Sequence, residues 1–140
     1  MGLLSENAGL SATRNPPCAA NANDNAVKQW MEFKDCKEIA KAFYRFRRRR
    51  DDIFPKGIFA DPAWDILLDL YISEVEGKKI SITSACAAAC VPATTALRWL
   101  SVLEERGLIV RIDDPNDNRR SFVRITGDAV YKITNLISKF

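Results

Sequence analysis

The sequence predicts a mainly α-helical fold with one small β-hairpin, in the α+β class. Three observations predict it. Apolar residues recur at helical spacing in several segments of the 140-residue chain. Near the C-terminal end, two short alternating segments flank a polar turn rich in Asp and Asn. Finally, 47% of the residues are apolar, which is enough for the core of one domain.

The composition excludes several classes of chemistry. The chain contains no histidine, so Ser/His/Asp triads, Cys/His dyads and histidine-ligated metal sites cannot form from this chain alone. No arrangement of acid, base and nucleophile points to catalysis. We therefore expect no enzymatic activity, no cofactor and no metal. We see no signal peptide and no apolar run of transmembrane length, so we expect no membrane association and a reducing, cytoplasmic setting.

The N-terminal part of the chain divides into a tail and a helix. Residues 1–26 are rich in Asn, Ala, Ser and Pro and predict a flexible tail. Residues 27–60 are predicted to form a helix, to about Arg50, and a linker broken by Pro55 and Gly57. This helix is long and rich in aromatic residues, and we expect it to contribute a dimer contact.

A run of arginines closes this predicted helix. The cations suit the negative end of the helix dipole. We favour a solvated helix end, while contact with the phosphates of a nucleic acid and a role in a partner surface are two other interpretations. The run consists of Arg45, Arg47, Arg48, Arg49 and Arg50.

The next helix has clear boundaries. Asp61 is a good N-cap, Pro62 suits the first helical position, and Gly77 ends the pattern. Asp61, Asp65 and Asp69 share one face of this helix. We interpret it as a solvated face rather than a cation site, because it offers no other type of ligand. The apolar stripe holds Trp64, Leu67, Leu68, Tyr71, Ile72 and Val75.

The remaining elements are short. A strand at 79–82 is followed by a helix that Thr83 or Ser84 caps and that ends near Cys90. Pro92 begins the next helix, and Gly107 ends it. The later elements are predicted as strands at 108–112 and 121–126, joined by a turn at 113–118, and a last helix from about Thr126.

Two consecutive helices with a tight turn, followed at once by a hairpin, indicate a winged helix-turn-helix over residues 61–140. In such units the second helix, here residues 92–106, enters the DNA major groove. Its buried stripe is predicted to hold Ala96, Trp99, Leu100 and Leu103. The candidate DNA-binding residues of this helix are Ala93, Thr94, Thr95, Leu97, Arg98 and Ser101.

The candidate residues of the helix suit contact with base edges. The small residues allow close approach, threonine hydroxyls can bond bases or phosphates, and Arg98 can reach a guanine or a phosphate. Leu97 lies off the buried stripe, and either a thymine methyl group or packing under the wing would explain it. An ordinary solvated surface is the alternative for the whole face.

The hairpin tip at 113–120 adds a second candidate contact. Arginines on an extended loop can enter a minor groove or clamp phosphates, and Asp117 could pair with Arg119. Arg111 and Arg124 lie in the flanking strands. A routine polar turn is the alternative. The candidate DNA-binding residues of the tip are Asp117, Asn118, Arg119 and Arg120.

The segments 94–109 and 114–126 resemble the recognition helix and wing of MarR-type transcriptional regulators. The family's Asp-x-Arg wing motif falls on Asp117 and Arg119. The resemblance, over about residues 61–128, implies a homodimeric DNA-binding protein, and such proteins are often released from DNA by phenolic ligands or oxidation. The chain departs from the family in having one predicted C-terminal helix after the wing where two are usual.

The expected partners are double-stranded DNA and a second copy of the chain, bound through the N-terminal and C-terminal helices. The sequence does not indicate a polar pocket, so it does not support the binding of a small-molecule effector. Redox sensing needs an exposed thiolate, whereas Cys86 and Cys90 are expected to be buried in an Ala-rich helix. The alternative function is a winged-helix protein-interaction module without specific DNA binding, since residues 61–140 hold ten bases and eleven acids.

Overall fold

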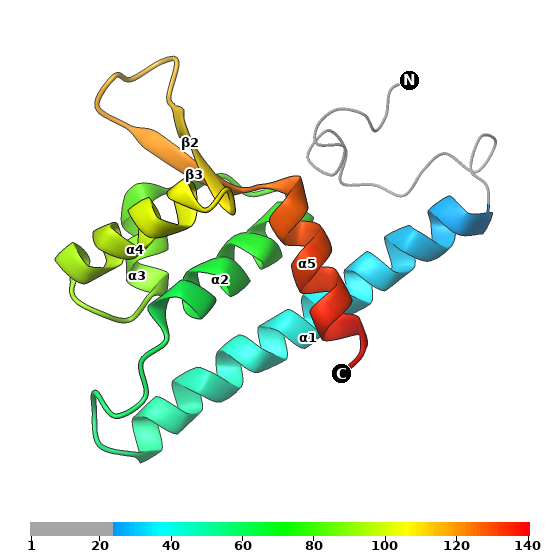
Figure 1. Ribbon diagram of the computed structural model, residues 1–140, viewed down its shortest axis with the longest axis horizontal. Helices are drawn as coiled ribbons and strands as arrows, with labels where there is room; N and C mark the ends of the chain where they lie inside the picture. The colour runs from blue at the N-terminus through cyan, green and yellow to red at the C-terminus, as the bar shows by residue number, and fades with distance from the viewer. Residues whose placement is uncertain (1–23) are drawn as a thin grey trace.

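The computed structural model describes residues 24–140, with side chains from Lys34 onward. This part of the chain forms five helices and a three-stranded antiparallel sheet (Figure 1). Most of the predicted tail, residues 1–23, lies outside the described residues. The elements are α1 (Asp24–Ile53), α2 (Pro62–Glu76), β1 (Ile80–Ser81), α3 (Ile82–Ala88), α4 (Ala93–Glu105), β2 (Ile109–Asp113), β3 (Ser121–Ile125) and α5 (Gly127–Ser138).

Helix α1 runs along one edge of the molecule (Figure 1) and is longer than predicted. Residues 24–26, assigned to the tail, form its first turn. Its C-terminal end lies at Ile53 rather than near Arg50. Arg48 forms an i,i+3 ion pair with Asp51 at 3.1 Å, which supports the additional turn.

Helix α2 lies at the centre of the core. Its side chains Ile66, Leu68 and Tyr71 are completely buried. The Tyr71 hydroxyl and the Thr134 hydroxyl of α5 are 2.8 Å apart and share a hydrogen bond. The predicted boundaries are confirmed. The Asp61 carboxylate accepts a hydrogen bond from the Trp64 amide, and the helix ends at Gly77, whose φ of 74° is left-handed.

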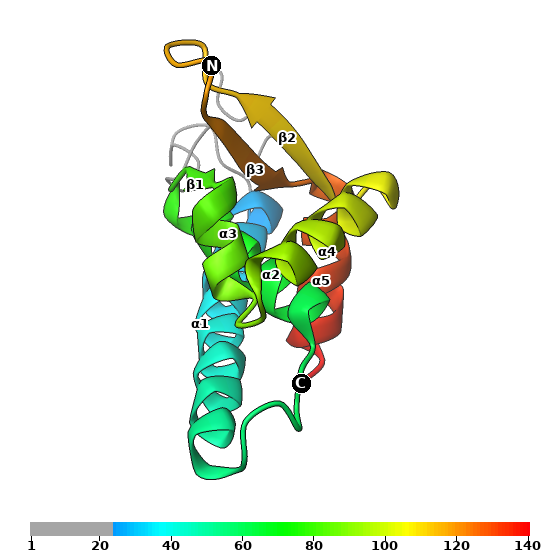
Figure 2. The same cartoon turned by 90° about the vertical axis from the view of Figure 1, so that its left-hand side faces the viewer.

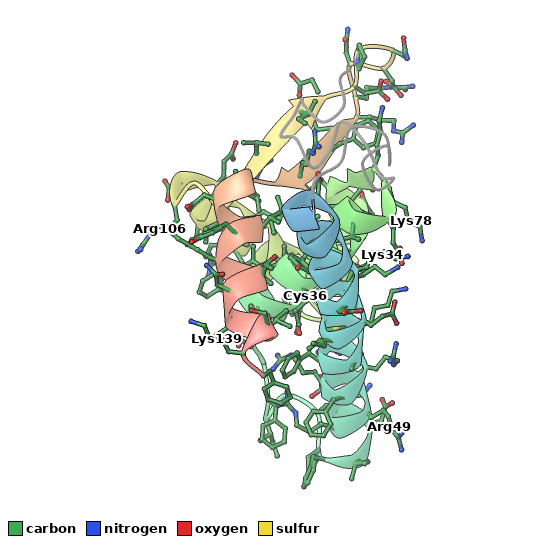
Figure 3. The ribbon with its side chains drawn as sticks, turned by 90° about the vertical axis from the view of Figure 1, so that its right-hand side faces the viewer. Lys34, Cys36, Arg49, Lys78, Arg106 and Lys139 are labelled. Carbon is green, nitrogen blue, oxygen red and sulfur yellow. The ribbon has the colours of Figure 1, made fainter. Side chains whose placement is uncertain are left out.

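Helices α1 and α5 pack against each other at the far side of the molecule from the hairpin. Figure 3 shows Cys36 of α1 pointing into the space between the two helices, where its thiol lies 3.9 Å from the Thr134 carbonyl. Phe43 and Phe140 meet edge to face, with ring centroids 4.9 Å apart. The described part of the chain contains no single helix with the length and apolar character of a membrane span, although the bent pair α3 and α4 passes on length and composition.

The sheet has the order β1-β3-β2. The predicted strand at 79–82 is only two residues long, and its pairing with β3 was not predicted. Val123 and Ile125 of β3 face the core, and Phe122 and Arg124 alternate with them, as predicted. Ser81, rather than Thr83 or Ser84, caps α3, because its hydroxyl accepts a hydrogen bond from the Ser84 amide at 3.1 Å.

Ion pairs join α1 to α2 near the C-terminal end of α2. The Glu76 carboxylate lies 2.7 Å from the Lys41 ammonium group and 3.9 Å from that of Lys37. The hydrogen bond from Lys41 lowers the pKa of Glu76 below its ordinary value. The same contact raises the pKa of Lys41. Both groups are therefore charged at neutral pH.

Replacing Glu76 should make the stability of the fold less sensitive to acid. The carboxylate has a lowered pKa, so it stabilises the fold above its ordinary pKa of 4.5, and this contribution is lost as the pH falls through the lowered value. In Glu76→Gln, we expect a smaller free energy of unfolding near neutral pH and no difference from the wild type in strong acid. Urea denaturation over a pH series measures both. A difference that is constant over the series would contradict the assignment.

Candidate nucleic-acid interface

Helices α3 and α4 form the predicted helix-turn-helix. Their axes bend by 106°, which is the geometry of this motif. Cys90 lies in the turn between them and adopts a positive φ of 55°, an uncommon conformation for a residue other than glycine. The predicted stripe of α4 faces the core: Ala96, Leu100 and Leu103 are buried, and Trp99 is half-buried against them.

The opposite face of α4 carries the predicted contact residues. Thr94, Arg98 and Ser101 are exposed together with Ala93, while Thr95 is half-buried. Leu97 is 41% exposed. Within the described residues, no hydrogen bond or ion pair engages the side chains of Thr94 or Arg98. These donors are therefore available to a ligand.

The N-terminal end of α4 also presents free donors. Pro92 occupies the N-cap position, and no side chain caps the helix there. The backbone N–H groups of the first turn are consequently left for an external acceptor. A phosphate is a suitable acceptor, because these N–H groups lie at the positive end of the helix dipole.

The β2–β3 hairpin forms the wing and extends beyond the helices (Figure 2). Aspartates fix its tip. The Asp117 carboxylate accepts hydrogen bonds from the Arg119 amide at 3.0 Å and from Arg119 Nε at 3.4 Å, as predicted. The Asp114 carboxylate accepts one from the Asn116 amide at 2.9 Å. The Arg119 side chain nevertheless remains 91% exposed.

The other arginines of the hairpin differ in how strongly they are engaged. Arg120 lies over the Phe122 ring at 5.2 Å and 3.9 Å from Asp114, and it stays exposed. Arg111 and Arg124, considered above as flanking DNA contacts, form ion pairs within the protein. Arg111 donates to Glu104 at 3.1 Å. Arg124 donates to both oxygens of the buried Glu74 carboxylate, at 3.0 and 2.9 Å.

The arginine run is not simply a solvated helix end. Arg47 donates to both oxygens of Asp65 at 2.6 and 3.3 Å, and Arg48 donates to the same carboxylate at 3.0 Å. Asp65 is buried, so its assignment to a solvated face was also wrong. The hydrogen bond to Asp65 raises the pKa of Arg47. Arg45 and Arg49 are exposed, as expected of a solvated end.

Helix α1 also holds the turn that precedes α4. The Tyr44 hydroxyl donates to the Ala88 carbonyl at 2.9 Å, and burial raises the pKa of this hydroxyl. Arg48 lies over the Tyr44 ring at 5.1 Å and contacts the Cys90 thiol. Cys90 is exposed, in contrast to its predicted burial. Cys86 is half-buried, which raises the pKa of its thiol.

Sequence reasoning missed the buried acids Asp65 and Glu74. One signal was available: residues 61–77 hold five acids and no base, whereas bases dominate the segments on both sides. Such an imbalance favours ion pairs between segments. The pattern alone does not show which acid lies inside, because Asp65 falls next to the apolar stripe rather than on it.

Comparison with known proteins gives a distant likeness to regulators of known structure. No family model matches the chain. No curated protein matches it either. The chain is similar to the transcriptional regulator Tm0710 from Thermotoga maritima, with 24% identity, 76% of this chain and 69% of that chain covered, and a TM-score of 0.45.

Two further solved structures are similar over more of this chain. MepR of S. aureus bound to ethidium bromide has 16% identity, covers 86% of this chain and 79% of its own, and gives a TM-score of 0.46. BpsR of Bordetella bronchiseptica, whose DNA binding is regulated by 6-hydroxynicotinic acid, has 15% identity, covers 89% and 82%, and gives 0.43. At these values the function has to rest on the chain's own residues.

Removing the charge of Asp65 should destabilise the whole fold. In Asp65→Asn, Arg47 and Arg48 lose the buried carboxylate that neutralises them, and breaking such a pair from one side costs about 3–5 kcal/mol. Urea denaturation measures the loss. Asp52→Asn is the matched control, because Asp52 is exposed at the end of α1. Equal effects of the two substitutions would show that Asp65 has no special role.

Proposed function

We propose that this chain is a sequence-specific DNA-binding transcriptional regulator of the MarR type. One observation carries the proposal. Two elements, α4 and the wing tip, keep strongly exposed arginines: Arg98 is exposed, and Arg119 stays 91% exposed beside Asp117. The arginines of the two strands, Arg111 and Arg124, are instead held in ion pairs with Glu104 and Glu74. The basic groups that remain available lie where a winged helix meets DNA.

Helix α4 is proposed to read the major groove. The small exposed residues Ala93 and Thr94 at its start allow the backbone to approach base edges closely. Arg98 lies one turn further on, and it is suited to a guanine or a phosphate. Leu97 is exposed beside it and fits the methyl group of a thymine. The free N–H groups of the first turn suit a phosphate.

The wing tip is proposed to enter the minor groove. Arg119 projects into solvent while Asp117 holds its backbone, so the guanidinium is positioned before DNA arrives. Asn118 and Arg120 are exposed next to it. A narrow minor groove attracts arginine through its negative potential. The tip contacts would contribute affinity more than sequence preference.

The regulator is proposed to act as a homodimer formed through α1 and α5. Large apolar side chains support this, because Phe46 is 67% exposed, Tyr131 68% and Phe140 88%. Two copies related by a two-fold axis would read a pseudo-palindrome with half-sites roughly 10 bp apart. A transcriptional regulator acts in the compartment that contains the DNA, and the cytoplasmic setting expected from the sequence agrees with this role.

A protein-interaction role is the second candidate. On the wing strand β2, Val110 and Ile112 are more than 40% exposed. Exposed apolar residues of this kind suit a surface that binds another protein. Selection of DNA sequences by the purified protein separates the two functions. Enrichment of a palindromic site supports the regulator. Equal affinity for all sequences, lost at moderate salt, would overturn sequence-specific regulation and leave the protein-interaction role as the candidate.

Arg119→Ala should weaken binding to every DNA sequence by a similar factor. If Arg119 neutralises a phosphate or lies in the minor groove, its loss lowers the slope of log affinity against log salt concentration by about 1. Fluorescence anisotropy over a salt series measures the slope. Lys56→Ala is the control, because Lys56 is exposed in the loop between α1 and α2, outside the elements proposed for DNA and for the dimer. An unchanged slope in Arg119→Ala would remove the wing from the interface.

Arg98→Ala should instead change which sequences are preferred. A bidentate contact to guanine contributes about 1–3 kcal/mol of discrimination, so the variant should accept other bases at one position of each half-site. Repeating the sequence selection with the variant measures this. A variant with the wild-type preference and a lower salt slope would assign Arg98 to a phosphate.

A further inference from the structure

Two cations from separate parts of the chain share the aromatic ring of Phe122. The Lys79 ammonium group lies 5.5 Å from the centre of this ring, and the Arg120 guanidinium lies 5.2 Å from it. Lys79 belongs to the segment between α2 and β1, whereas Arg120 directly precedes β3. Both distances are within the range of cation–π interactions. We call Lys79, Arg120 and Phe122 the Phe122 cluster.

The charges of the Phe122 cluster are not neutralised by the described part of the chain. There, Lys79 is exposed and has no ion-pair partner. Arg120 has only Asp114, at 3.9 Å, and its side chain remains 56% exposed. The next base of β3 differs, because Arg124 is bound to the buried Glu74. Two like charges held on one ring repel each other, so the cluster favours the approach of anions.

The register of the sheet places the cluster between the wing and the helix-turn-helix. Phe122 pairs with Ser81 of β1, and its neighbour Val123 faces the core. Phe122 therefore lies on the outer face of the sheet, because successive side chains of a strand alternate. Ser81 also caps α3, the first helix of the helix-turn-helix. In Figure 2, β1 lies beside β3 at the start of α3.

Both elements beside the cluster face DNA in the proposed function. In a helix-turn-helix, the first helix crosses the DNA backbone while the second enters the major groove. Backbone phosphates that lie between the wing and the start of α3 would therefore meet the Phe122 cluster. Successive phosphates of one strand each carry a negative charge, so two separate cations suit them.

We propose that Lys79 binds a DNA phosphate, and that the Phe122 ring positions Lys79 and Arg120 for neighbouring phosphates of one strand. The phosphates lie beyond the base pairs that α4 reads. The contact contributes affinity rather than sequence preference, because the lysine ammonium group is a point charge and phosphates are the same in every sequence. This inference rests on the DNA binding of the proposed function, and it adds a contact outside α4 and the wing tip.

Replacement of Lys79 tests the contact. In Lys79→Ala, the slope of log affinity against log salt concentration should fall by about 1, and the preferred sequence should not change. Lys78→Ala is the matched control, because Lys78 is the adjacent lysine and pairs with Glu76 at 3.0 Å. Its slope should stay at the wild-type value. Fluorescence anisotropy over a salt series measures both variants on the DNA site that the wild type selects.

Replacement of Phe122 tests the positioning role. Phe122→Leu removes the ring and keeps an apolar side chain, so it should weaken DNA binding, whereas Phe122→Tyr keeps the ring and should bind within about twofold of the wild type. In the Phe122→Leu background, Lys79→Ala should cost less than about half of its effect on log affinity in the wild type, because a double-mutant cycle measures the coupling of the two residues. Urea denaturation checks that the Phe122 variants remain folded.

Shortened DNA gives a second measurement, which leaves the protein unchanged. The wild type should bind a duplex that ends at the last specified base pair of each half-site at least about threefold more weakly than a duplex with flanking base pairs. Lys79→Ala should lose less affinity between the two duplexes, since it no longer contacts the flanking phosphates. Lys78→Ala should lose as much as the wild type.

Several results would overturn the proposal. They are a wild-type slope in Lys79→Ala, an equal fall of the slope in Lys78→Ala, and equal sensitivity of Lys79→Ala and the wild type to the length of the duplex. If the wild type still selects a sequence, these results leave the proposed function intact, and the first favours an acidic protein as the ligand of the cluster. A wild type that binds all sequences equally overturns specific regulation, while the slopes still decide the role of Lys79. A wild type that binds no DNA overturns both.

Discussion

The fold depends on one buried carboxylate that binds the guanidinium groups of two successive arginines. Asp65 lies inside the molecule on α2, while Arg47 and Arg48 reach it from the C-terminal half of α1. Taking charges out of water is costly, and their attraction repays this only when several hydrogen bonds form. Three such bonds are present. An apolar contact could shift along the helix, but this one fixes the position of α1 relative to α2.

Ion pairing between the acids of α2 and bases from other elements also accounts for the distribution of charge over the molecule. The acids of α2 form ion pairs with bases from segments before and after it in the sequence. Asp65 and Glu76 bind bases of α1, and Glu74 binds Arg124 of β3. The mild net charge of +3 therefore conceals internal neutralisation. The arginines left exposed include Arg98 on α4 and Arg119 at the wing tip, the two elements proposed to contact DNA.

Periodicity and capping predicted the fold class and most boundaries, because both are local properties. The stripe of α4, the caps of α2 and the alternation in β3 each depend on residues a few positions apart. Asp65, Arg124 and β1 could not be placed in this way, since their partners come from distant segments. The candidate DNA face of α4 was predictable because it is what remains after the buried stripe is removed. The exposure of Cys90 was not, because it lies in the turn after the Ala-rich helix.

The hydrogen bond from Tyr44 to Ala88 has a consequence for the independence of the helix-turn-helix. It joins residues 44 positions apart, and with the arginines at Asp65 it ties the unit to α1. The boundary at residue 60 that the sequence suggests would separate the two partners of each of these contacts. In a fragment that begins at Asp61, the Asp65 carboxylate would lose its cations and the Ala88 carbonyl its donor. The first helix is thus a structural part of the unit that presents α4.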